Sequence, residues 1–146
     1  MDNLVNIIST KISTSKNSNL LQFLDLFKNI KIYDWEKYKP KFPNKNNKNY
    51  YKHVIYLDDN YELILIKWDE NSTTSNHRHP KNGCIMKLLD GELNEDRFDN
   101  NKIYKKNNLK INDVGYMHDD LGTHKIYALK ESYSLHLYSP PNYYSN

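Results

Sequence analysis

Short apolar runs separated by turn signals are the feature that most restricts how this chain can fold. From about Tyr50 onward, Ile, Val, Tyr and Leu gather in the runs HVIYL, YELILIKW, CIMKLL, HKIYAL and YSLHLY, which Asn, Asp and Gly separate. Such runs are typical of β-strands, and gaps too short for crossover helices favour antiparallel pairing. We therefore predict a mainly β fold, a small antiparallel barrel or jelly roll, over residues 50–146.

The N-terminal residues 1–38 follow a helical pattern instead. Leu20, Phe23, Leu24 and Phe27 recur at helical spacing, and the asparagines of residues 17–19 are candidate caps. The stripe predicts a helical face that docks on the barrel.

Residues 39–49 are rich in lysine and asparagine and predict a loop, because such a composition buries little apolar surface. With 146 residues, of which 38% are hydrophobic, the chain is expected to form one domain overall. Its three parts are the helical segment 1–38, the loop 39–49 and the barrel 50–146.

The charge balance names no partner. Lys and Arg number 21 against 18 Asp and Glu, a net charge of +3, so we expect no nucleic-acid partner. A single cysteine excludes an internal disulfide, and no apolar run has the length of a signal peptide or a membrane span. We therefore expect a cytoplasmic protein without a membrane partner, and a monomer. Only Arg78 and Arg97 are arginine, which indicates a biased composition.

The sharpest local motif is His77-Arg78-His79. On a strand, residues i and i+2 share a face, so both imidazoles would reach one metal ion while Arg78 points the other way. Taken alone, the motif fits a solvated pair of histidines on an exposed strand better than a metal site.

The residues that follow make the motif more specific. Four residues after His79 comes Cys84, and six further residues lead to Gly91. This spacing resembles the first motif of the cupin barrels, with cysteine where most cupins have glutamate. Among cupins, that cysteine and the stretch CIMKLLDGELNEDRFD are similar to the cysteine dioxygenase family, which implies a cupin barrel with N-terminal helices.

Two later segments extend the resemblance. YMHDDLGTH resembles the family segment that ends in the third metal histidine, which implies that His124 joins His77 and His79 as a ligand of Fe(II). The block SLHLYSPP is similar to the family almost letter for letter. It implies that Ser134, His136 and Tyr138 form a hydrogen-bonded row beside the iron, with Tyr138 joined to Cys84 by a thioether.

Two departures from the family pattern stand out. Arg78 occupies a position where the family usually has aspartate. The family's carboxylate-binding arginine, two residues after a tyrosine, aligns with Lys52 after Tyr50, while a shift of one residue offers His53 after Tyr51. We prefer Lys52, which keeps the cation but loses the bidentate fork. A surface lysine is the ordinary alternative.

The resemblance implies an iron-dependent thiol dioxygenase that converts a small thiol, L-cysteine first, to its sulfinic acid with dioxygen. 3-Mercaptopropionate or another small thiol is an alternative substrate. A non-catalytic metal-binding cupin is also open, in which Cys84 is an inert buried thiol and Tyr138 and His136 are packing residues. A cupin enzyme of another class would need an acid at the position of Cys84.

Overall fold

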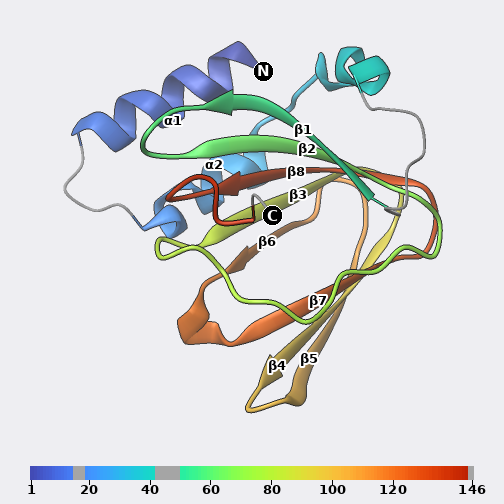
Figure 1. Ribbon diagram of the computed structural model, residues 1–146. Helices are drawn as coiled ribbons and strands as arrows, with labels where there is room; N and C mark the ends of the chain where they lie inside the picture. Colours follow the sequence, from blue (N-terminus) through green and yellow to red (C-terminus); the bar gives the residue numbers. More distant parts are fainter. Residues whose placement is uncertain (15–18, 42–49, 145–146) are drawn as a thin grey trace.

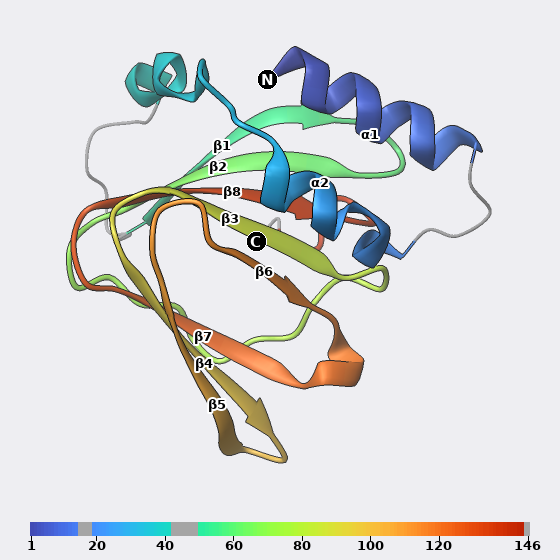
Figure 2. The same ribbon diagram turned by 180° about the vertical axis from the view of Figure 1, so that it is seen from behind.

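The computed structural model describes residues 1–14, 19–41 and 50–144. Two antiparallel sheets face each other, and the helices cover the outer side of the larger sheet (Figures 1 and 2). The strands are β1 (Tyr50–Leu57), β2 (Glu62–Trp68), β3 (Cys84–Asp90), β4 (Leu93–Asp99), β5 (Lys102–Leu109), β6 (Val114–Met117), β7 (Thr123–Ala128) and β8 (Ser132–Tyr138). The prediction of a mainly β fold with N-terminal helices is confirmed.

The strand order is that of two facing antiparallel sheets, as in a jelly roll. The five-stranded sheet has the order β1-β2-β8-β3-β6, and the three-stranded sheet has the order β5-β4-β7. The five apolar runs of the sequence form β1, β2, β3, β7 and β8. Strands β4 and β5 carry mostly polar residues and pair with each other along their whole length, so their apolar signal is weak.

The helical segment is divided into short pieces. These are α1 (Asp2–Thr14), the 3-10 helix η1 (Leu20–Phe23), α2 (Leu24–Asn29) and the 3-10 helix η2 (Trp35–Lys41). A further 3-10 helix, η3 (Asp119–Leu121), lies between β6 and β7. Residues 30–34 are not helical, and η2 runs into the stretch predicted to be a loop from residue 39. The rest of that loop, residues 42–49, lies outside the described residues.

Three of the four residues of the predicted apolar stripe face the larger sheet, and Leu24 is half-buried. Leu20, Phe23 and Phe27 are fully buried, and the Asn19 side chain accepts the Leu21 N–H at 2.8 Å as an N-cap. Together with residues of α1, they pack on the outward-facing side chains of the five-stranded sheet, among them Tyr61, Leu63, Leu65, Ile85, Leu135 and Leu137.

Two buried polar groups fix the helices to this sheet. The Lys87 ammonium of β3 donates to the backbone oxygens of Phe27 and Ile30 at 2.6 and 2.7 Å, at the C-terminal end of α2. The Tyr61 hydroxyl donates to the Val5 carbonyl at 3.2 Å and lies 2.7 Å from Ser9 Oγ, both on α1. The helices are thus attached by directed bonds as well as by apolar contact.

A second apolar cluster fills the space between the two sheets. It joins inward-facing residues of the larger sheet, such as Ile64 and Met86, to Leu93 and Ile126 of the smaller one. Gly122, just before β7, has φ +99°, and a Cβ there would lie 2.0 Å from the Phe98 carbonyl oxygen. Only glycine fits this approach, and it lets β7 run beside β4.

Within the described residues, none of the helices combines the length and apolar character that crossing a bilayer would require.

Candidate metal centre

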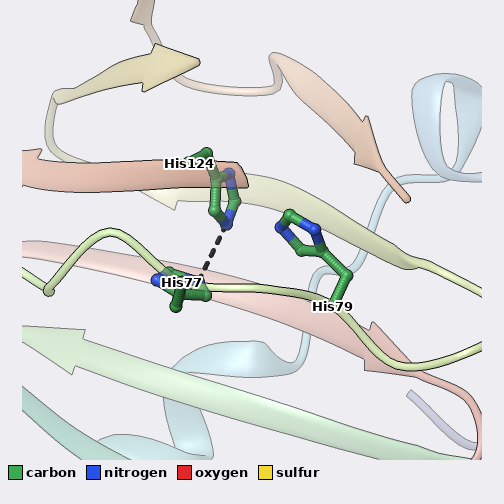
Figure 3. Close-up of side chains that lie close together, drawn as sticks. All are labelled: His77, His79 and His124. Carbon is green, nitrogen blue, oxygen red and sulfur yellow. Dashed lines mark hydrogen bonds between the residues drawn. The ribbon is translucent and has the colours of Figure 1, made fainter. Parts of the chain in front are cut away.

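Three histidines converge at one end of the space between the sheets (Figure 3). One ring nitrogen each of His77, His79 and His124 lies within 4.8 Å of the others. His124 is on β7, whereas His77 makes only an isolated bridge to His124 and His79 lies in a loop. The prediction that the His-x-His motif sits on a strand is therefore wrong. The two backbone bonds between His77 and His124, at 3.0 and 3.2 Å, align the motif instead.

The hydrogen bonds of two histidines define their tautomers. His77 Nδ1 lies 2.8 Å from the Ser75 carbonyl oxygen, and His124 Nδ1 lies 2.7 Å from Glu95 Oε2. Both partners are acceptors, so both Nδ1 atoms carry hydrogen and both Nε2 atoms present lone pairs. These two Nε2 atoms are 3.0 Å apart.

The third histidine is buried without hydrogen bonds for its ring. His79 is 1% exposed, and neither ring nitrogen has a hydrogen-bond partner among the described residues. Asp119 fixes its backbone instead, accepting the His79 N–H at 2.8 Å. Burial and the neighbouring His124 lower the pKa of His79 to about 2, and the same causes lower that of His77 to about 4.

These features fit a bound cation. Two lone pairs that face each other at 3.0 Å repel unless a positive ion lies between them, and the lowered pKa of His77 disfavours a proton on its ring. An unpartnered buried nitrogen on His79 gives the third donor. Three neutral imidazoles suit a first-row transition metal such as iron or zinc.

Glu95 of β4 holds His124 from behind. This carboxylate is 1% exposed and accepts from His124 Nδ1, from Arg97 Nε at 2.9 Å and from Asn107 Nδ2 at 2.8 Å. Burial alone would raise its pKa, but the bonds from His124 and the Arg97 charge lower the pKa to about 2. The carboxylate therefore stays ionised and fixes the ring orientation of His124.

A cavity of about 260 Å³ opens beside these histidines. It is lined by residues from both sheets and from the segment after β8: Tyr50, Lys52, Ile66, Trp68, Thr74, Ser75, His77, Cys84, Met86, His124, Ile126, His136, Tyr138, Tyr143 and Tyr144. The volume lies just below the range of about 300 Å³ and upward that is usual for drug-sized ligands. A small molecule of amino-acid size is the fitting occupant.

Ser134, His136 and Tyr138 form a hydrogen-bonded row on the inward face of β8. Ser134 Oγ lies 2.7 Å from His136 Nε2, and His136 Nδ1 lies 3.0 Å from the Tyr138 hydroxyl. The indole N–H of Trp68 donates to Ser134 Oγ at 2.8 Å. Among the described residues, His136 Nε2 is then the acceptor for the Ser134 hydroxyl hydrogen.

The donor and acceptor of each hydrogen bond in this row can be assigned. Burial holds the pKa of His136 well below 6.5, so the ring is neutral and, with Nε2 accepting, carries its hydrogen on Nδ1. His136 therefore donates to the Tyr138 oxygen. The hydroxyl hydrogen of Tyr138 is left to point into the cavity.

Cys84 lies directly opposite Tyr138. The two residues are register partners in the β3–β8 pair, and both line the cavity. Partners on one face of an antiparallel pair have Cβ atoms about 4.5–5.5 Å apart. Burial, followed by the negative charge of Glu95, raises the pKa of the Cys84 thiol to about 12, so it is protonated at neutral pH.

Lys52 and Tyr50 share one face of the edge strand β1 and both line the cavity. The Lys52 ammonium lies 5.2 Å from the ring centroid of Tyr144. The alternative pair is on the opposite face, where Tyr51 contacts Asp69 and the His53 ring lies 5.7 Å from that of Tyr38. Arg78 lines a separate cleft with Asp119, and none of the three histidines lines that cleft.

Four residues of this site were not predicted from the sequence: Trp68, Tyr144, Glu95 and Arg97. Trp68 and Tyr144 are single aromatics among many, and nothing in their spacing distinguishes them. Glu95 and Arg97 had a usable signal, because they follow Leu93 at alternate positions of a strand and thus share its inward face. An acid and an arginine on such a face indicate a buried ionic site.

Comparison with known proteins agrees with this geometry. The family model described as cysteine dioxygenase type I matches residues 12–145. Cysteine dioxygenase type 1 of Rattus norvegicus is 35% identical over 91 residues, which cover 56% of this chain and 46% of the rat protein. The Homo sapiens protein is 33% identical over a segment with the same shares. The match thus spans about half the length of these curated relatives.

Solved structures with the same fold are cupins of low sequence identity. An RmlC-like cupin from Shewanella frigidimarina aligns with a TM-score of 0.60 at 11% identity, over 74% of this chain and 92% of that one. KdgF from Halomonas sp. aligns with a TM-score of 0.58 at 17% identity, over 72% and 96% of the two chains. With the family model matching most of its length, the chain belongs to the cysteine dioxygenase type I family and has the cupin fold.

Proposed function

We propose that this protein is an Fe(II)-dependent thiol dioxygenase that oxidises a small carboxylate-bearing thiol, with L-cysteine as the first choice, to its sulfinic acid. The reaction is balanced as RSH + O₂ → RSO₂H. The observation that carries the proposal is the set of three converging imidazole nitrogens beside a small cavity that also presents Lys52 and Tyr138. Membership of the cysteine dioxygenase type I family supports it.

His77, His79 and His124 are the residues that would hold the iron. Bound Fe(II) would supply a site for dioxygen and lower the pKa of the substrate thiol, so that the thiol binds as a thiolate. Three neutral ligands on one side leave the cavity side open. The cavity is complete within one chain, which suits a monomer, and the free thiol of Cys84 suits a reducing cytoplasm.

Lys52 and Tyr50 would bind the substrate carboxylate. Both face the cavity from β1, and Lys52 supplies a cationic ammonium group. A lysine offers a point charge without the planar fork of arginine, so it discriminates less between carboxylates of different reach. This is the physical reason to keep 3-mercaptopropionate and other small thiols as alternative substrates.

Tyr138 would act on the substrate from the other side of the cavity. Its oxygen accepts from His136, so its hydroxyl hydrogen is free to be donated to a group bound in the cavity. Ser134 and Trp68 hold His136 in the tautomer that this requires. Cys84, the register partner of Tyr138, would form the thioether with its ring.

The test measures oxygen uptake and product together. We expect iron-loaded protein to consume one dioxygen per thiol with L-cysteine and to yield its sulfinate, detected by ¹H NMR. His124→Ala should lose metal and activity together, while His118→Ala, outside the three-histidine cluster, should keep both. Iron binding without oxygen uptake across L-cysteine, 3-mercaptopropionate and cysteamine would instead favour a non-catalytic metal-binding cupin.

A further inference from the structure

The segment after β8 returns over the cavity and places Tyr144 in its wall. The turn is fixed at two points. Asn82 donates to the Ser139 backbone oxygen at 2.9 Å, and the Asn142 N–H donates to the buried Glu62 carboxylate at 3.1 Å. These bonds direct the chain back toward the histidines.

Tyr144 contacts three parts of the site at once. Its ring centroid lies 4.9 Å from that of Tyr138 and 5.5 Å from that of His77, edge-on in both cases. Its face receives the Lys52 ammonium at 5.2 Å, and its hydroxyl donates to the Arg78 backbone oxygen. One ring therefore spans from the histidine cluster to the proposed carboxylate-binding lysine.

This position limits what can bind. A thiol with sulfur at the histidines and a carboxylate at Lys52 lies along the Tyr144 ring, within a cavity of about 260 Å³. In a peptide thiol such as glutathione, the amino and carboxyl groups of the cysteine residue are in amide bonds to further residues, and these would have to occupy the space of the ring. The hydrogen bond to Arg78 and the packing on Tyr138 oppose movement of the ring away.

We propose that Tyr144 is a specificity-determining residue that restricts this site to single-amino-acid-sized thiols and excludes peptide thiols such as glutathione. The inference rests on the proposed function and deepens it by naming the upper size limit of the substrate. Tyr144 also positions the Lys52 ammonium through the face of its ring.

The experiment compares Tyr144→Ala with Tyr144→Phe, which keeps the ring. Tyr33→Ala, at a tyrosine that is 86% exposed, controls for the loss of a tyrosine. For Tyr144→Ala we expect the ratio of kcat/KM for glutathione over that for L-cysteine to rise at least tenfold, with a several-fold higher KM for L-cysteine. Tyr144→Phe and Tyr33→Ala should keep the wild-type ratio within about twofold.

A binding measurement separates this inference from the proposed function. Calorimetry on zinc-loaded protein needs no turnover, and it should show glutathione binding to Tyr144→Ala and not to the wild type. Wild-type protein that consumes oxygen with none of the thiols would refute the dioxygenase proposal. The binding comparison would still test whether Tyr144 limits the size of the ligand. An unchanged glutathione preference in Tyr144→Ala, in both binding and turnover, would overturn the inference.

Discussion

Replacing Glu95 with glutamine removes one charge and changes no volume, so it isolates the carboxylate that holds His124. The carboxylate accepts three donors, from His124 at 2.7 Å, Arg97 at 2.9 Å and Asn107 at 2.8 Å. A glutamine has one acceptor oxygen, and its amide nitrogen must face at least one of these donors. Loss of such a partner behind a metal-bound histidine typically weakens metal binding 10- to 100-fold, about 1.4–2.7 kcal/mol.

The assay is competition for zinc or Fe(II) against a chromophoric chelator at neutral pH. Asp96→Asn is the matched control, because among the described residues this neighbouring carboxylate makes only a long ion pair, with Lys106 at 3.9 Å. We expect the control to bind metal like the wild type. Melting of the metal-free proteins identifies any general loss of fold. A Glu95→Gln protein that is folded and retains metal affinity within twofold of the wild type would refute the assigned role of Glu95.

Three further predictions concern the substrate, the cross-link and the attachment of α1. Lys52→Met should raise KM for L-cysteine roughly tenfold by loss of a charged hydrogen bond of about 1.5 kcal/mol. The control Lys67→Met, outside the cavity, should leave KM unchanged. A Lys52→Met protein with the KM of the wild type would show that the carboxylate binds elsewhere. Iron-dependent turnover should accumulate a Cys84–Tyr138 thioether, in which a C–S bond replaces one S–H and one ring C–H bond and dioxygen takes the two electrons and two protons. Peptide mass mapping should find the pair lighter by two hydrogens, and its absence at every stage of turnover would contradict the prediction. Burial raises the pKa of Tyr61 from 10.0 to about 12, so between these values the unfolded chain loses the phenol proton first and stability falls as pH rises. Other buried groups, such as the Cys84 thiol, contribute in the same direction, so Tyr61→Phe should make this slope shallower in urea melts at pH 9 to 12. An unchanged slope would show that Tyr61 does not contribute to it.

Much of the fold can be predicted from local sequence patterns, because a strand that is buried on one or both faces appears in the sequence as a pattern of apolar residues. Strands β2, β3 and β8 are buried along nearly their whole length and appear as apolar runs. Strand β5 is almost entirely exposed, and its pairing with β4 is set by the turn between them and by backbone bonds. A polar strand of this kind has no apolar period from which it could be predicted.

In the candidate site, too, local sequence patterns predict some features and not others. The row on β8 follows from strand periodicity, which places Ser134, His136 and Tyr138 on one face. The convergence of His77 and His79 does not, because their segment is a loop aligned by a bridge to His124, 47 residues away in sequence. Such a non-local pairing is absent from any local pattern, and here the family resemblance carried the prediction.

The choice between lysine and arginine follows the geometry that each position requires. Only two of the 21 basic residues are arginine. Arg97 Nε donates to Glu95 while its Nη2 donates to the Tyr116 backbone oxygen at 3.1 Å, two acceptors in different directions. A lysine ammonium carries its three donors on one nitrogen and lacks the planar fork, whose separate N–H groups reach two acceptors in fixed directions. At Lys52, on an exposed edge strand, a point charge is sufficient to attract a carboxylate. The arginine therefore stands where the orientation of His124, a proposed metal ligand, depends on a fork, and the lysine stands where the proposed substrate needs only a cation.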